Sequence, residues 1–227
     1  MKYTSCTVSD SRVELFQNLT LDEMDELQKN MVTIRYKKGE TICRLGTLAP
    51  YIILVKEGLA NAFIEGCDDV LVVNIIPPGN FIALSVVANT NGMFPYSSKA
   101  YVNTEVALID IKVFRELLSK NILFANDVLK LVSAHLQQVY GRFYCISTKQ
   151  LYGRLADILI CLSEKIFKCN SFNLVLSRQE LAQLTKMSTE SIIRLLKKFK
   201  DDGLIDMDGK LLTILDLDRL RKIADTG

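Results

Sequence analysis

The 227-residue sequence contains no tryptophan, a single histidine and only four prolines. No apolar run reaches the roughly 18 residues that a membrane-spanning helix requires. Its first residues, MKYTSCTVSD, lack the basic and then apolar pattern of a secretion signal. We therefore expect a soluble protein that stays in the cytoplasm and does not bind a membrane.

The motifs on which many enzymes depend are also absent. There is no glycine-rich phosphate loop, no G-x-S-x-G nucleophile elbow, and no C-x-x-C pair among the six cysteines. The single histidine, His135, lies within a helical pattern, which favours an ordinary helical position over a haem or metal ligand. The sequence predicts no enzyme, no metal site and no cofactor, and it favours free, mostly buried thiols.

Charge of neither sign dominates the chain, because 28 Lys and Arg residues stand against 26 Asp and Glu residues for a net charge of +2. The total therefore does not indicate nucleic acid as a partner. The cations are instead concentrated locally, with five of them against one carboxylate between Lys186 and Lys200. Such a local concentration is typical of a protein that binds DNA at specific sites.

This basic segment belongs to a stretch, 176–205, that reads as two short helices joined by a tight turn. Ser177 and Glu180 form the pattern of a capping box, and Ser188 is a second N-cap. The second helix has a buried face formed by Ile192, Leu195, Leu196 and Phe199. Residues 204–214 then read as two strands around an Asp-Gly turn. A plain helical hairpin with a solvated basic face explains the helices, but only a winged helix-turn-helix explains the whole order.

Through SRQELAQLTKMSTESIIRLLKKFKDDGLI the sequence resembles the cAMP-receptor/Fnr (Crp/Fnr) family of bacterial transcription regulators. The resemblance implies base contacts from Glu190, which can accept from cytosine N4, and Arg194, which can donate to guanine O6 and N7. Two further expected base contacts depart from the family pattern. Thr189 stands at an arginine position of the cAMP-receptor branch, and Ile193 at a glycine or serine position. The expected phosphate contacts are Ser177, Arg178, Gln179, Ser188, Lys197 and Lys210.

The first half of the chain predicts short helices over 11–30, with Val13 and Leu15 packed and Thr20 as a cap, and then strands from Met31 to Leu108. Glycine-bearing turns separate these strands at intervals of about 8–12 residues, which indicates a sandwich or barrel. The order resembles the β-roll of cyclic-nucleotide-binding domains. The predicted fold class is therefore α+β, with an N-terminal jelly roll of this type, a long dimerisation helix and a C-terminal winged helix-turn-helix.

The resemblance also bears on which effectors this domain can bind. Leu84 stands where the family has the glutamate that holds ribose, and Phe94 where it has the arginine that holds the cyclic phosphate. We expect no cAMP binding, because a buried phosphate without a cation is costly. An iron–sulfur sensor of the Fnr type is disfavoured as well, because only Cys6 lies near the N-terminus. The residues left for an unidentified effector, or for an ordinary polar loop, are Asn80, Leu84, Tyr96, Ser97, Ser98 and Lys99.

Residues 121–147 read as one long helix, followed by a polar hinge at 147–150. Its apolar residues repeat at alternating intervals of four and three, the pattern of a coiled-coil seam, while Val128, Leu131 and Tyr140 can face the β-roll. Either the seam pairs two chains or both faces are buried within one; two-fold DNA sites favour a parallel homodimer. The seam residues are Leu129, Val132, Leu136, Val139, Phe143 and Ile146.

The sequence thus predicts three segments. They are an effector-like domain at 1–120, the dimerisation helix at 121–147 and a DNA-binding domain at 148–227. The expected partners are double-stranded DNA, a second copy of the chain, RNA polymerase and an unidentified small-molecule effector. The operator sequence, and the choice between activator and repressor, stay open.

Overall fold

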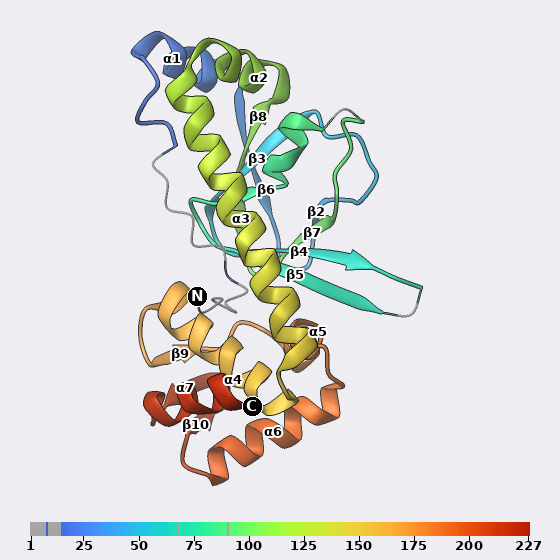
Figure 1. Ribbon diagram of the computed structural model, residues 1–227, viewed down its shortest axis with the longest axis vertical. Helices are drawn as coiled ribbons and strands as arrows, with labels where there is room; N and C mark the ends of the chain where they lie inside the picture. Colours follow the sequence, from blue (N-terminus) through green and yellow to red (C-terminus); the bar gives the residue numbers. More distant parts are fainter. Residues whose placement is uncertain (1–7, 9–14, 68, 90) are drawn as a thin grey trace. The chain divides into compact units, whose positions relative to one another are not determined.

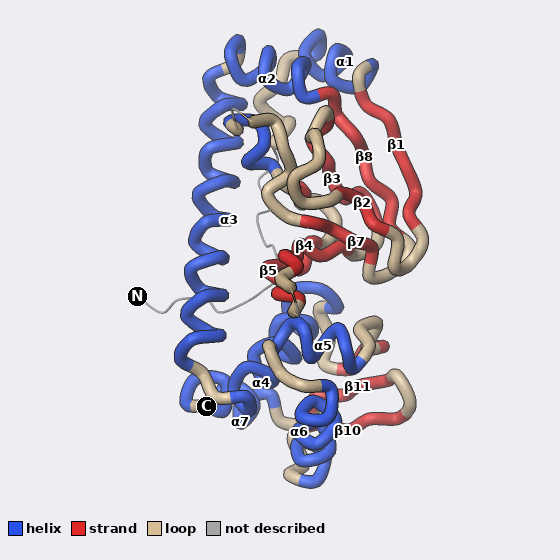
Figure 2. The backbone as a smooth tube through the Cα atoms, turned by 90° about the vertical axis from the view of Figure 1, so that its right-hand side faces the viewer, coloured by secondary structure: helices blue, strands red, loops and turns tan. Residues whose placement is uncertain are grey.

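The apolar runs of the first half form two four-stranded sheets in the computed structural model, which describes residues 8, 15–67, 69–89 and 91–227 (Figure 1). In the first sheet, β1, β8 and β3 lie side by side (Figure 2). Its strands, in spatial order, are β1 (Met31–Tyr36), β8 (Thr104–Asp110), β3 (Tyr51–Glu57) and β6 (Phe81–Ile82). The second sheet consists of β2 (Thr41–Cys43), β7 (Ser97–Ala100), β4 (Ala60–Glu65) and β5 (Val70–Ile76). This arrangement confirms the predicted β-roll.

The core of the first sheet forms where β3 pairs with β8 in antiparallel register, with Ile52 opposite Ile109 and Val55 opposite Val106. All four side chains are fully buried. The chain leaves β3 through Gly58, which has a φ of +90°. A Cβ atom at this position would lie 2.5 Å from the backbone oxygen of Asn103, so the turn requires glycine.

Helices flank the β-roll in the sequence. Thr20 is the expected N-cap of α1 (Leu21–Lys29), and the structure adds Glu23, which completes a capping box with it; Asp110 caps α2 (Ile111–Lys120). In the sequence, a short 3-10 helix, η1 (Leu84–Ala88), lies between β6 and β7. A chain of aromatic contacts links the segment before α1, strand β6, helix α2 and the next helix through Phe16, Phe81, Phe114 and Phe124. Leu15 is buried as predicted, whereas Val13 lies outside the described residues.

The long helix is present as α3 (Ile122–Thr148), 27 residues without a break. Phe124, Val128 and Leu131 are buried on one side of it. Tyr140 was expected on this buried side, but 54% of its surface is exposed, so that prediction is wrong. The polar segment after α3 is shorter than predicted, because only Lys149 and Gln150 separate this helix from the next.

The C-terminal third is helical, with a small sheet in the order β10-β11-β9. Its helices are α4 (Leu151–Cys161), η2 (Leu162–Phe167, a π-helical turn), α5 (Arg178–Thr185), α6 (Thr189–Asp201) and α7 (Leu217–Thr226). Its strands are β9 (Ser171–Asn173), β10 (Ile205–Asp208) and β11 (Leu211–Ile214). The two strands around the Asp-Gly turn are thus the expected wing, with a third strand added to it.

The described residues fall into two compact units, each with its own core. Of the described residues, one unit comprises 15–65, 74–89 and 91–137, and the other comprises Val8, 66–67, 69–73 and 138–227. Helix α3 begins in the first and ends in the second. No helix in the described part of the chain is long and apolar enough to cross a membrane.

The cysteines differ in part from the expectation of free, mostly buried thiols. Cys43 and Cys145 are free and buried, and burial raises their pKa values to about 12 and about 11. Cys67 and Cys169 are free but exposed. Cys161 is disulfide-bonded, so the prediction is wrong at this position.

Candidate nucleic-acid interface

The two helices of the predicted helix-turn-helix begin at the expected residues. Ser177 Oγ accepts from the backbone N–H of Glu180 at 3.2 Å, and the carboxylate of Glu180 accepts from the backbone N–H of Ser177 at 2.7 Å. Helix α5 ends at Thr185, and its C-cap, Lys186, adopts a left-handed conformation with a φ of +57°. Ser188 then caps α6 by accepting from the backbone N–H of Ser191. Both N-caps and the tight turn confirm the local prediction.

Packing decides which face of α6 points outward. Ile192, Leu196 and Phe199 are buried on its inner face, and the ring of Phe199 meets that of Tyr152 edge-on with centroids 4.6 Å apart. Leu195, which was expected to be buried with them, is only half-buried. The opposite face is therefore directed away from the core of this unit.

Three of the four predicted base-contacting residues are exposed on that outer face: Glu190, Ile193 and Arg194. Thr189 is half-buried at the first turn. Hydrogen bonds from the backbone at the start of α6 and from the Ser188 side chain lower the pKa of Glu190, so the carboxylate is ionised at neutral pH. Within the described residues, the side chain of Arg194 has no hydrogen bond or ion pair that would hold it away from a ligand.

The predicted phosphate contacts lie at the helix starts and in the wing, except for Lys197, which lies past the middle of α6. Ser177 and Ser188 are the caps themselves, where backbone N–H groups and the helix dipole favour an anion. Gln179, Lys197 and Lys210 are exposed. Arg178 is half-buried and burial lowers its pKa; its Nη2 atom lies 3.6 Å from the sulfur of Met207 in the wing.

Two further cations of α6 are held within the unit, which the sequence did not indicate. Lys200 pairs with Asp206 at 2.8 Å, and Lys198 lies over the ring of Tyr152 at 5.0 Å from its centroid. Part of the apparent basic face of α6 therefore stabilises its contact with the wing and α4. Among the described residues, the cations of α6 without such a contact are Arg194 and Lys197, which lie nearer the middle of the helix.

The structure also identifies residues that hold α5 in place and that no motif predicted. Arg142 of α3 donates through Nη2 to the backbone oxygen of Leu184, and Arg154 of α4 donates through Nη1 to that of Thr185. Nε of Arg154 also donates to the backbone oxygen of Lys149 at 2.8 Å. Carbonyl groups in the last turn of a helix lack partners within the helix, and cations there complement its dipole. These arginines fix the carboxyl end of α5 and hence the turn before α6.

In the β-roll, most polar side chains of the predicted effector pocket already have partners. Tyr96 OH accepts from the backbone N–H of Ala83 at 2.6 Å, and Ser97 Oγ accepts from that of Leu45 at 3.1 Å. The amide of Asn80 donates to the oxygens of its own turn. The remaining members are half-buried Leu84, buried Ser98 and Lys99, whose ammonium lies over the ring of Phe63. These contacts disfavour a preformed effector site, and the alternative of a polar loop is wrong for Ser97, Ser98 and Lys99, which belong to strand β7.

Comparison with known proteins assigns both parts of the chain. Residues 153–223 match the family model of the Crp-like helix-turn-helix domain, and residues 33–121 match that of the cyclic nucleotide-binding domain. The chain is 26% identical to transcriptional activator protein anr of Pseudomonas aeruginosa, over 91% of this chain and 86% of that protein. It is 22% identical to the fumarate and nitrate reduction regulatory protein of Escherichia coli, over 90% of this chain and 82% of that protein.

Solved structures share the fold. FixK2 from Bradyrhizobium japonicum superposes with a TM-score of 0.79 at 16% identity, covering 85% of this chain and 96% of that one. A transcriptional regulator of the crp/fnr family from Eubacterium rectale superposes with a TM-score of 0.76 at 21% identity, covering 94% of this chain and 99% of that one.

A β-roll of the cyclic-nucleotide-binding type, joined to a Crp-like winged helix-turn-helix, defines a DNA-binding transcription regulator rather than an enzyme. The helix-turn-helix is the part that binds DNA. The chain belongs to the Crp/Fnr family of transcription regulators. This confirms the family resemblance and the predicted fold class.

Proposed function

We propose that the chain acts as a homodimer that reads a pseudo-palindromic DNA site through the outer face of α6. The observation that carries this proposal is that Glu190 and Arg194 are both exposed one helical turn apart, on a helix whose other face is buried. In the major groove, Arg194 donates to guanine and Glu190 accepts from cytosine, while Thr189 and Ile193 contact neighbouring bases. Phosphate contacts from the two N-caps and from Arg178, Gln179, Lys197 and Lys210 hold α6 in register.

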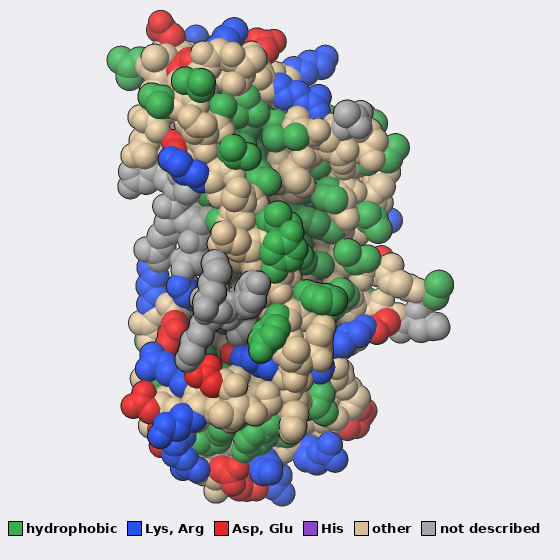
Figure 3. All heavy atoms as spheres, in the orientation of Figure 1, with side chains coloured by type: hydrophobic (Ala, Val, Ile, Leu, Met, Phe, Trp, Pro, Cys, Tyr) green, Lys and Arg blue, Asp and Glu red, His purple; other side chains and the backbone are tan. Residues whose placement is uncertain are grey.

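Dimerisation is supported by an exposed apolar stripe on α3. Ile122, Leu129, Leu136 and Phe143 recur every seven residues, with exposed fractions of 75%, 63%, 48% and 68%. A seven-residue repeat keeps one seam of a helix against a parallel partner. On the face drawn in Figure 3, hydrophobic side chains follow the course of α3. The other proposed seam residues are Val132, Val139 and Ile146, which are half-buried or exposed.

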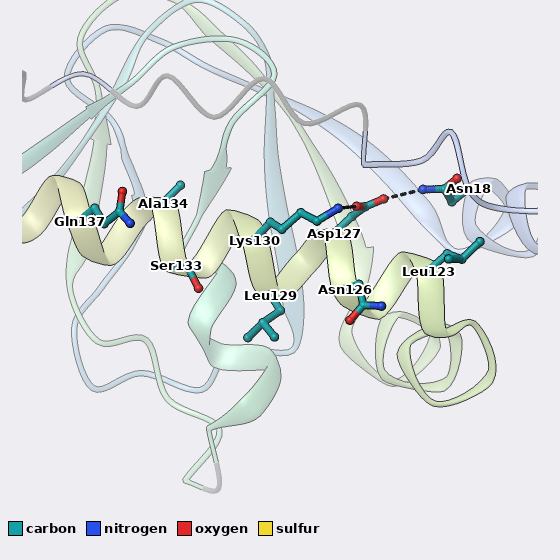
Figure 4. A pocket seen from close by; sticks show the side chains of 9 residues that line it. All are labelled: Asn18, Leu123, Asn126, Asp127, Leu129, Lys130, Ser133, Ala134 and Gln137. Carbon is teal, nitrogen blue, oxygen red and sulfur yellow. Dashed lines mark hydrogen bonds and ion pairs between the residues drawn. The ribbon is translucent and has the colours of Figure 1, made fainter.

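Beside this stripe lies an open groove of about 540 Å³ (Figure 4). Leu129 forms its apolar wall, and the carboxylate of Asp127 accepts from Asn18 at 2.6 Å and from Lys130 at 2.9 Å. The groove runs along the helix surface and is flanked by uncharged polar residues, Asn126, Ser133 and Gln137. Its neutral flank places no like charges opposite each other when two copies of α3 pair in parallel.

The sensor-like domain, in this proposal, has lost the ability to bind cAMP. Phe94 occupies the position of the phosphate-binding arginine, and only 6% of its surface is exposed. An anionic phosphate there would lie against an aromatic ring without a counter-charge, which is unfavourable. A thermal unfolding series with cAMP and a metabolite panel tests this point: cAMP leaves the midpoint unchanged, and a compound that raises it is the effector.

The segments retain the roles expected from the sequence. We assign effector-like functions to 1–120, dimerisation to 121–147 and DNA binding to 148–227. RNA polymerase is a proposed further partner, supported by the relatives that are transcriptional activators.

Selection of bound sequences from a random DNA pool tests the proposal as a whole. The expected result is a two-fold symmetric site whose half-sites are centred about 34 Å apart, one turn of the duplex. A selected pool with no sequence preference, or with a single half-site and no symmetry, contradicts the proposal.

A further inference from the structure

The outer face of α6 contains one residue that does not fit its surroundings. Every other exposed residue of this helix is charged, whereas Ile193 is a large apolar side chain with 55% of its surface exposed. The helix does not need it for packing, because Ile192, Leu196 and Phe199 already fill the inner face. Isoleucine is also a weaker helix former than the charged residues that would suit an exposed position.

Its position relative to the proposed base contacts is specific. On a helix surface, residues three and four apart are neighbours, so Ile193 lies beside Glu190 and directly precedes Arg194. An apolar side chain between two base-reading polar groups faces the same groove as they do. The chemistry of that groove then limits what it can contact: the C5-methyl group of thymine is the apolar group among the base edges there.

We propose that Ile193 is a specificity-determining residue that reads a thymine methyl group in each half-site, next to the base pairs contacted by Glu190 and Arg194. This inference rests on the proposed function and names one base of the operator. Ile193 supplies no hydrogen bond. It discriminates thymine from other bases because a methyl group is buried against the side chain only when thymine is present. A cytosine at this place would instead expose an amino group that loses its bound water and finds no other hydrogen-bond acceptor.

Removal of that methyl group is the most direct test. The full-length protein is titrated against the selected duplex and against duplexes in which one thymine at a time is replaced by deoxyuridine, which keeps base pairing and removes only the methyl. At one position of the half-site, we expect affinity to fall about fourfold when one half-site is changed and about 14-fold when both are, the effect of one buried methyl group in each.

Two variants give the matched controls. Ile193→Ser removes the apolar contact, so this variant binds the thymine and deoxyuridine duplexes equally; Ile193→Val keeps it, so this variant still prefers thymine. Circular dichroism and thermal unfolding establish that both variants are folded. The inference is overturned if no deoxyuridine replacement lowers the affinity of the parent protein by at least twofold, or if the selected half-site has no thymine. It is also overturned if the parent protein and Ile193→Ser lose the same amount of affinity on replacement. In each case a symmetric selected site leaves the proposed function standing, whereas absence of any selected site removes both.

Discussion

Nζ of Lys149 lies 2.5 Å from Oδ2 of Asp157, and the two side chains are only 12% and 11% exposed. This ion pair joins the residue that follows α3 to the middle of α4. It lies next to Arg154, which binds the backbone oxygen of Lys149 and the carboxyl end of α5. The segment that the sequence indicated as a polar hinge therefore contains a buried ionic contact.

Loss of one partner of this pair destabilises the C-terminal unit. For Asp157→Asn we expect the free energy of unfolding to fall by about 3–5 kcal/mol, because the buried ion pair loses its carboxylate charge. Urea unfolding followed by circular dichroism measures the change. The double variant Lys149→Met with Asp157→Leu removes both charges and recovers most of the stability. Equal midpoints for the single variant and the parent protein rule out a stabilising role for the carboxylate.

A charge in the α3 stripe prevents pairing of two chains. We expect Leu136→Glu and Phe143→Glu each to convert the proposed dimer to a monomer, because two like charges would meet across the seam in an apolar surrounding. Analytical ultracentrifugation measures the mass. Leu48→Glu is the control, since Leu48 is also exposed but lies between β2 and β3. Dimers that persist in both seam variants contradict the proposed interface.

Base readout and phosphate binding are separable by two variants of α6. Arg194→Ala relaxes the preference at one base pair and loses about 1–3 kcal/mol of discrimination there. Lys197→Ala weakens binding almost uniformly across sequences and lowers the slope of log affinity against log salt by about 1. Competition binding at several salt concentrations distinguishes the two. If both variants lose affinity uniformly, Arg194 does not read a base.

Stability depends on the protonation of His135, the only histidine of the chain. Burial lowers the pKa of His135 below its ordinary value of 6.5, so the unfolded chain binds the proton more readily than the folded one. The free energy of unfolding is therefore highest above pH 6.5 and falls as the pH is lowered through the window between the unfolded and folded values.

Urea unfolding at about pH 7.5 and about pH 5.5 measures this dependence, in a range where carboxylates with ordinary pKa values stay ionised. The variant His135→Gln provides the control and has a flatter profile between the two pH values. A parent protein that is equally stable at both, or a variant with the same slope, contradicts the assignment to His135.

The sequence was sufficient wherever a structural signal is local. The predicted cap at Thr20 and the predicted capping box of Ser177 with Glu180 depend on residues within three positions, and both are present. The apolar spacing of α3 likewise predicted a continuous helix. A hydrogen-bonded cap or a helical repeat depends on neighbouring residues alone, so no tertiary information is needed to find it.

Contacts between residues that are distant in the sequence could not be predicted from local patterns. Lys198 and Lys200 looked like free cations of a basic face, but Tyr152 and Asp206 hold them. Tyr140 fitted a buried strip by spacing and is exposed. Arg142 and Arg154 are ordinary members of helical patterns until the fold brings α5 to them. Each of these outcomes depends on which side chain from elsewhere in the chain lies nearby.

The sequence by itself determined the helix-turn-helix, its caps and the chemistry of the residues on α6, because these follow from side chains within a few positions of one another. Only the tertiary structure decided which side of α3 packs on its own chain and which cations are already paired. Burial is a property of the folded surface: an apolar residue has a packing role only if another element covers it, and periodicity alone does not say which face is covered.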